Sequence, residues 1–122
     1  MKKLFIAACI LSAFPLTASA AITATASASP IAYSGSCPGV ITFKGKIKST
    51  GRTTVRYRWI RSDGASAPIH SITFAAAGTK TVTTTWTLGG ASLPTYSGWE
   101  AVKILVPVAL TSNKAKFTLK CH

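Results

Sequence analysis

Side chains able to perform catalysis are scarce in this sequence. Its 122 residues include two acidic residues, Asp63 and Glu100, and two histidines, His70 and His122. Asp63 stands in an Asp-Gly turn signal, and we expect Glu100 to be a surface ion-pair partner for a nearby Lys or Arg. A two-carboxylate mechanism needs an acid and a base in different environments. Ser71, His70 and Asp63 have the residue types of a hydrolytic triad, but no nucleophile-elbow motif accompanies them. We therefore expect no enzymatic activity.

Metal ligands are equally few. A zinc site takes three or four ligands, whereas the nitrogen and sulfur donors here are two scattered histidines and three cysteines. We expect His122, at the end of the sequence, and His70, in an edge strand, to be solvated. No metal and no other cofactor is predicted.

Residues 1–20 have the pattern of a secretory signal peptide. Lys2 and Lys3 precede an apolar run, Leu4–Phe14, and Ala18-Ser19-Ala20 fits the small-x-small rule for cleavage after Ala20. The apolar run is shorter than the roughly 20 residues of a membrane span. A retained helix is one alternative. A lipoprotein is another, because residues 6–9 resemble a lipobox, but that interpretation leaves only two apolar residues ahead of the box.

Export determines how the cysteines are interpreted. Cys9 leaves with the signal peptide, so Cys37 and Cys121 remain as an even pair in an oxidising compartment. Cysteines in such a compartment favour a disulfide. This bond would tie the start of the domain to its last strand. Free reactive thiols are the alternative, although no Cys-x-x-Cys motif is present.

The charge balance is strongly basic. The chain carries 14 Lys and Arg against two acids, and loss of Lys2 and Lys3 lowers the net charge from +12 to +10. Such an imbalance favours acidic partners such as nucleic acid, anionic lipid, lipopolysaccharide or anionic glycans. The alternative is that the charge only keeps the protein soluble. The candidate polyanion-binding residues form three groups: Lys44, Lys46 and Lys48; Arg56, Arg58 and Arg61; and Lys114, Lys116 and Lys120.

Many of these basic residues alternate with apolar residues along the sequence, and this alternation predicts that β-strands position them. In Thr53–Gly64, Val55, Tyr57 and Trp59 point one way and the arginines between them point the other, as in a half-buried strand. Similar patterns predict further strands at 40–49, 69–74, 80–88, 99–107 and 115–121, with a leader or weak edge strand within 21–36. In the strand at 99–107 we expect residues 102, 104 and 106 to form the core face.

The placement of the aromatic residues argues against nucleic acid as the partner. Binding of single strands uses aromatic side chains within a basic surface, but Phe43, Tyr57, Trp59 and Phe117 alternate away from the Lys and Arg positions. Two aromatic residues are exceptions. Tyr96 and Trp99 lie by a Gly- and Pro-containing loop, residues 89–98, and are candidate loop contacts.

About seven short strands in some 100 residues predict an all-β, antiparallel β-sandwich. The chain resembles small secreted bacterial immunoglobulin-like or fibronectin type III-like domains in Cys37, the Val55–Trp59 strand, Tyr96 and Cys121. The resemblance implies an immunoglobulin-like domain at 37–122, with Trp59 as its central buried tryptophan. It also implies that the Tyr96 hydroxyl bonds back to the chain upstream. In antibody domains the second cysteine lies two residues after that tyrosine, where this sequence has Gly98.

Two functions from different classes follow. The first is a secreted or periplasmic, non-catalytic binding module whose basic surface attaches to an anionic surface or a protein partner. The second is a structural or inhibitory protein that acts through the loop at 88–98, with the charge serving only solubility. Salt separates them, because electrostatic attachment weakens with ionic strength and insertion of an apolar loop does not.

Overall fold

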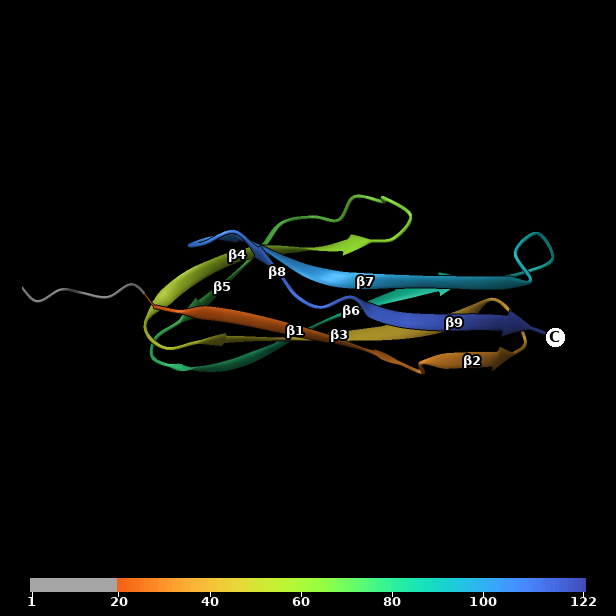
Figure 1. The fold of residues 1–122 in the computed structure, drawn as a ribbon, viewed down its shortest axis with the longest axis horizontal. Coiled ribbons are helices and arrows are strands. Elements are labelled where there is room, and N and C mark those ends of the chain that lie inside the picture. The colour runs from red at the N-terminus through yellow and green to blue at the C-terminus, as the bar shows by residue number, and fades with distance from the viewer. Residues whose placement is uncertain (1–19) are drawn as a thin grey trace, which may run out of the picture.

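The computed structural model describes residues 20–122, which form nine strands (Figure 1). The predicted signal peptide, residues 1–20, lies outside the described residues except for Ala20. In this part of the chain no helix is long and apolar enough to cross a membrane. The strands are β1 (Ile22–Ser29), β2 (Ala32–Gly35), β3 (Gly39–Ser49), β4 (Thr53–Arg61), β5 (His70–Phe74), β6 (Gly78–Leu88), β7 (Thr95–Val106), β8 (Leu110–Thr111) and β9 (Ala115–Cys121).

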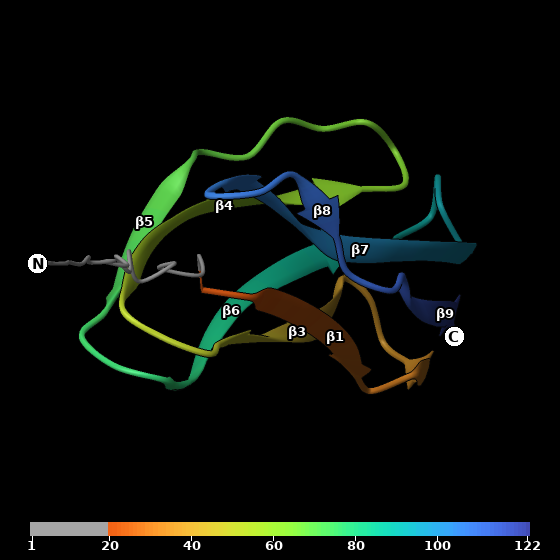
Figure 2. The same ribbon diagram turned by 60° about the vertical axis from the view of Figure 1, so that its left-hand side comes forward.

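The strands form two sheets that pack face to face (Figure 2). One sheet has the order β1-β3-β6, and the other has the order β2-β9-β7-β4-β5 with β8 paired to β7. The all-β immunoglobulin-like sandwich predicted from the sequence is confirmed. It has nine strands rather than about seven, and the pairing of β2 with β9 is parallel where we expected antiparallel strands throughout.

Residues 22–35 contribute one strand to each sheet. β1 pairs along its whole length with β3, from Ile22 opposite Ser49 to Ser29 opposite Thr42. The chain then turns at Pro30 and Ile31, and β2 joins the edge of the larger sheet beside β9. On the other edge of β1, the Asn113 side chain bonds both backbone groups of Ala26. The sandwich therefore includes residues 22–35, which precede position 37, where the resemblance placed the start of the domain.

The core lies between the sheets and is built by the alternation seen in the sequence. Trp59 is 4% exposed, and Phe43 and Phe117 are fully buried. The Phe43 ring centroid lies 6.4 Å from that of Trp59 and 5.7 Å from that of Phe117. Glycine at position 45 of β3 lets the facing sheet approach closely, because a Cβ there would lie 2.6 Å from a methyl carbon of Val102.

The chain path shows where the strands change sheet and where β7 begins. β3 and β4 lie in different sheets, so residues 50–52 cross from one sheet to the other. β7 begins at Thr95, so the expected loop at 89–98 is shorter, and Tyr96 lies within a strand. Val106, expected in the core, is 42% exposed because β4 and β7 lose their regular register next to it, between Arg56 and Tyr57.

Candidate polyanion-binding surface

Lys44, Lys46 and Lys48 occupy alternate positions of β3, the central strand of the three-stranded sheet. All three are exposed, whereas residues 43, 45 and 47, each of which directly precedes one of the lysines, are buried. Side chains two residues apart on a strand point to the same face, about 6.5–7 Å apart. The three ammonium groups therefore form one column on the outer face of this sheet, the column that we call the lysine row.

Hydroxyl side chains flank the lysine row on both sides. Each lysine is directly opposite a Ser or Thr of β1 and a Thr of β6, and all six of these residues are exposed. Neighbouring strands lie about 4.7–4.9 Å apart, so each lysine side chain leaves the sheet between two hydroxyl-bearing residues. These neighbours are Ser27 and Thr83 for Lys44, Thr25 and Thr81 for Lys46, and Thr23 and Thr79 for Lys48.

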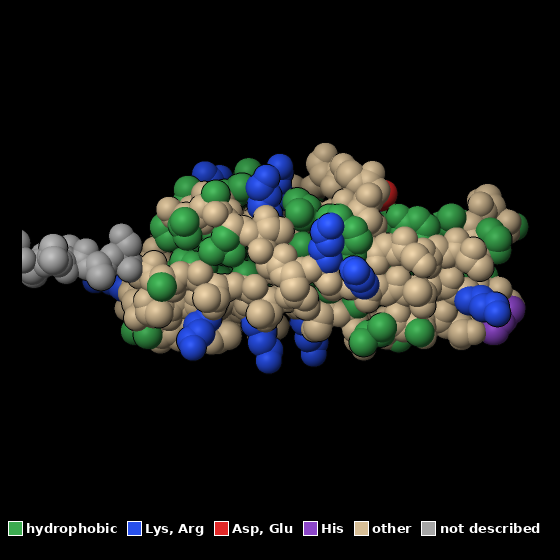
Figure 3. Space-filling model, viewed as in Figure 1, with side chains coloured by type: hydrophobic (Ala, Val, Ile, Leu, Met, Phe, Trp, Pro, Cys, Tyr) green, Lys and Arg blue, Asp and Glu red, His purple; other side chains and the backbone are tan. Residues whose placement is uncertain are grey.

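Neither acidic side chain neutralises this face. Asp63 is held by Arg61, whose Nε donates to a carboxylate oxygen over 3.0 Å. This hydrogen bond, with a second one from the Ala65 backbone N–H, lowers the pKa of Asp63 to about 2. Glu100 lies inside the sandwich. Within residues 20–122 the lysine row is therefore a cationic surface without an acidic partner, and Figure 3 shows cationic side chains projecting along one long edge of the molecule.

The three arginines proposed as a second basic group do not share a face. Arg56 is exposed, but Arg58 is half-buried, and its Nε has no hydrogen-bond partner within the described residues. Arg61 has the same strand parity as Trp59 and turns inward, where its guanidinium lies 3.9 Å from the Trp86 ring centroid. Arg61 is thus a structural residue that caps the end of the core, and the grouping of these arginines as one binding surface is wrong.

The third basic group lies on the other side of the sandwich. Lys116 and Lys120 are exposed on β9, which belongs to the larger sheet. Lys114 precedes β9, and its ammonium nitrogen is 4.7 Å from the Trp99 ring centroid, within the range of a cation–π interaction. The predicted polyanion-binding residues are therefore divided between two opposite outer faces, and only the lysine row forms a regular column of side chains.

Tyr96 and Trp99, the candidate loop contacts, both belong to β7. Tyr96 is half-buried, and its ring packs 5.6 Å from Trp86. Its hydroxyl lies 3.5 Å from the Ser62 hydroxyl, so it does reach the chain upstream, but through a side chain. Trp99 is half-buried on the outer face of the larger sheet, with its backbone N–H donating to Ser62. Tyr96 and Trp99 therefore do not form an exposed pair beside the loop.

Glu100 is not the surface ion-pair partner that we expected. It is 1% exposed and faces the core, because it has the same strand parity as Val102 and Ile104. Arg61 lies directly opposite it on β4, but the salt bridge of Arg61 goes to Asp63. Burial raises the pKa of Glu100 to about 7, and the charge of Arg61 offsets only part of this effect.

The disulfide between Cys37 and Cys121 is present, with an S–S distance of 2.01 Å. It joins the segment before β3 to the last residue of β9. The neighbouring loop, residues 89–94, is held by mutual backbone hydrogen bonds between Gly90 and Leu93. A further bond from the Cys121 N–H to the Pro94 carbonyl attaches this loop to β9.

The histidines lie on different parts of the sandwich. His70 on β5 lies 5.5 Å from the Tyr57 ring, and His122 lies 3.1 Å from the Ser34 hydroxyl. Among residues 20–122, no three His, Cys, Asp or Glu side chains gather in a group that could hold a metal ion.

Comparison with known proteins adds information about the fold. No protein-family model matches the chain, and no curated protein sequence matches it. A solved structure, the CARDB domain of the PF1109 protein from Pyrococcus furiosus in complex with di-metal ions, is similar with a TM-score of 0.55. The two are 14% identical over 83% of this chain and 89% of that one. At this identity the likeness shows the immunoglobulin-like sandwich alone.

The sequence did not reveal the hydroxyl groups beside the lysine row. The alternation of Thr with Val82, Thr84 and Trp86 indicated an exposed threonine face. Which strand lies beside it is set by sheet pairing, however, and one sequence does not determine that pairing.

Proposed function

We propose that this chain is a non-catalytic binding module that attaches to a polyanion through the lysine row. The observation that supports it is the column of Lys44, Lys46 and Lys48 at the centre of an open sheet face, flanked by six exposed hydroxyl residues and without a carboxylate. Like charges in a column repel one another, and a linear polyanion lying along β3 would relieve this repulsion. The partner that fits is an anionic glycan, such as a sulfated polysaccharide or the sugar-phosphate part of lipopolysaccharide.

The chemistry of the surface suits sugars with charged substituents. Each ammonium group has three donors for a sulfate or phosphate, and the hydroxyl groups beside it can donate to or accept from sugar hydroxyls. Because these side chains are exposed, their attraction for the polymer is screened by salt. We therefore expect binding that is strong at low ionic strength and falls steeply as salt is added.

Export would place the module where such polymers occur. Residues 1–20 carry the pattern of a signal peptide, and the disulfide suits a secreted or periplasmic location. Intact-mass measurement of the exported protein should give a chain that begins at Ala21. A mass that retains a lipid on Cys9 would contradict this part of the proposal.

Retention on a heparin column tests the proposed surface. Changing Lys44, Lys46 and Lys48 together to Gln should lower the salt concentration needed for elution, because three aligned contacts are lost. A matched control removes the same charge from the opposite face by changing Arg56, Lys103 and Lys120 to Gln, and it should shift elution much less. Equal shifts for the two variants would mean that only net charge matters, and the assignment to the lysine row would be wrong.

A further inference from the structure

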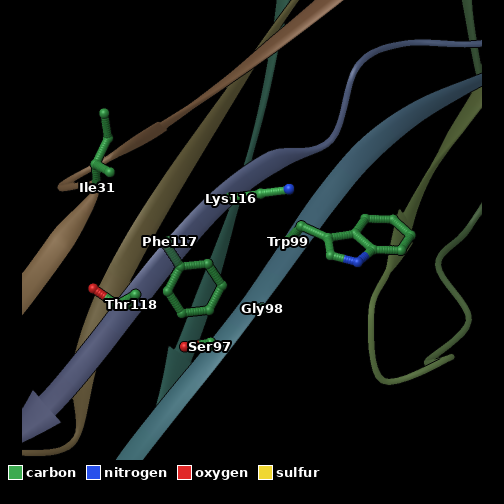
Figure 4. Close-up of a pocket in the computed structure, with 7 residues that line it drawn as sticks. All are labelled: Ile31, Ser97, Gly98, Trp99, Lys116, Phe117 and Thr118. Atoms are coloured by element: carbon green, nitrogen blue, oxygen red, sulfur yellow. The ribbon is translucent and has the colours of Figure 1, made fainter.

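A second surface feature lies on the opposite side of the sandwich from the lysine row. It is a hollow of about 300 Å³ on the outer face of the larger sheet. Two cross-strand pairs form its floor, Trp99 with Lys116 and Ser97 with Thr118. Figure 4 shows Ile31 on the far side of β9 from Trp99, with the Lys116 ammonium directed toward the indole. We call this feature the Trp99 hollow.

The lining of the Trp99 hollow is mainly apolar although the hollow is open to solvent. Ile31 is 69% exposed, the largest exposed fraction among the big apolar side chains described. It sits in the link between β1 and β2, where its carbonyl accepts a hydrogen bond from the Thr118 N–H over 2.8 Å. This bond fixes the residue next to small side chains at positions 97 and 118. The side chains of Ile31 and Trp99 thus border a space that the small side chains at positions 97 and 118 do not fill.

The charge around the Trp99 hollow has one sign. Lys116 is part of its floor, and the Lys114 ammonium nitrogen lies 4.7 Å from the Trp99 ring centroid. The two carboxylates of the described chain are committed elsewhere, Asp63 to its pair with Arg61 and Glu100 to the interior. Small-molecule sites combine an apolar lining with a few placed polar groups and have volumes from about 300 Å³ upward. The complement of this hollow is an apolar body that carries one negative charge.

We propose that the Trp99 hollow binds a small organic anion with an apolar, ring-containing body and a single carboxylate, sulfate or sulfonate group. The body would lie between Ile31 and Trp99, and the anionic group would pair with Lys116 and Lys114. This binding is independent of the polyanion surface, because the two sites are on opposite faces of the sandwich.

Two fluorescent probes with the same rings test the proposal on the mature, disulfide-bonded chain. 1-Anilinonaphthalene-8-sulfonate carries an anionic group, and N-phenyl-1-naphthylamine lacks it. We expect the sulfonate to bind saturably with one site per chain, and the neutral probe to bind about tenfold or more weakly. Lys116→Gln should weaken the sulfonate about fivefold and leave the neutral probe unchanged, since a partly exposed ion pair is worth roughly 1 kcal/mol.

Variants of the lining distinguish the hollow from other surfaces. Ile31→Ser should weaken sulfonate binding about five- to tenfold without loss of folding, because the side chain is mostly exposed. Trp99→Ala should weaken it at least as much. Val40→Ser is the matched control, because Val40 is 48% exposed on the outer face of the other sheet, and this change should leave binding unaltered.

Each remaining outcome would overturn the proposal. Unsaturable binding, or equal losses for Ile31→Ser and Val40→Ser, would place the probe elsewhere. Equal affinities for the two probes would exclude an anion as the ligand. If sedimentation showed that the probe competes with dimer formation, and that Ile31→Ser abolishes the dimer, the occupant of the hollow would be a second copy of the chain. None of these results bears on heparin retention, so the two proposals succeed or fail separately.

Discussion

Replacing Glu100 by Gln should make the fold more stable at pH 8 and leave its stability nearly unchanged at pH 5. Burial raises the pKa of this carboxyl from 4.5 to about 7. Each unit by which the pKa is raised corresponds to about 1.4 kcal/mol of free energy that disfavours the ionised carboxylate. Ionisation of Glu100 in the folded chain therefore costs roughly 3 kcal/mol at alkaline pH, a large part of the stability of a small domain.

The direction follows from proton binding in the two states. Between pH 4.5 and about 7 the folded chain retains a proton on Glu100 that the unfolded chain has released. Stability must then fall as the pH rises through this window, and it should level off above it. Asp63 behaves in the opposite way. Its pKa is lowered to about 2, so the stability that it contributes is complete above pH 4 and is lost only in acid.

Urea unfolding at several pH values between 5 and 8.5 measures this effect. The wild-type free energy of unfolding should decline across the range, whereas that of Glu100→Gln should decline less by roughly 2–3 kcal/mol. Asp63→Asn serves as the control and should keep the wild-type slope in this window. Parallel pH profiles for wild type and Glu100→Gln would show that the carboxyl is hydrated or paired in solution, and the account of its burial would be refuted.

Three further predictions concern the packing of the sandwich. Trp59→Ala should cost about 3–5 kcal/mol, the range for large aromatic truncations in a core, and a native-like melting temperature would mean that Trp59 is not packed as described. Gly45→Ala should cost about 1–3 kcal/mol in chemical denaturation, since the new methyl meets Val102 and the centre of a strand cannot easily shift. Cys37→Ala with Cys121→Ala should lower stability by about 4–5 kcal/mol for a separation of 84 residues on the chain-entropy model. An unchanged denaturation midpoint would contradict it.

The period of two was sufficient for the local faces of most strands. It placed Phe43, Trp59 and Phe117 inward correctly, because each lies in a run where apolar and polar residues alternate. The same rule extended back from Val102 places Glu100 inward, whereas its charge alone predicts a position at the surface. Parity also places Arg61 on the Trp59 side. Strand parity was therefore a better guide than residue type at both positions.

One sequence did not determine which strands pair or which sheet each strand joins. Nothing local indicates that β2 runs parallel to β9, or that β3 and β9 belong to different sheets. The division of the lysines between two faces depends on that choice, and so does the Trp99 hollow, whose wall includes Ile31 from a segment far from β7 and β9 in the sequence. Such contacts arise from long-range pairing, which hydrophobic periodicity does not encode.

The position of the disulfide also determines how the molecule would carry a mechanical load. The described chain begins at one end of the long axis and ends at the other (Figure 1). The disulfide holds Cys121, the residue before the C-terminal His122. Tension between the two ends would run through residues 20–37, cross the Cys37–Cys121 bond and leave at His122. Residues 38–120 lie within the covalent loop and are bypassed while the bond is intact.

The strand that bears this load is β1. It would be drawn lengthwise against β3, so the ladder between them, eight residue pairs long, would be loaded in shear along its whole length. After reduction, the C-terminal pull would instead act first on β9, between β2 and β7. The oxidised domain would then extend by little more than its first two strands, whereas the reduced domain would unravel entirely.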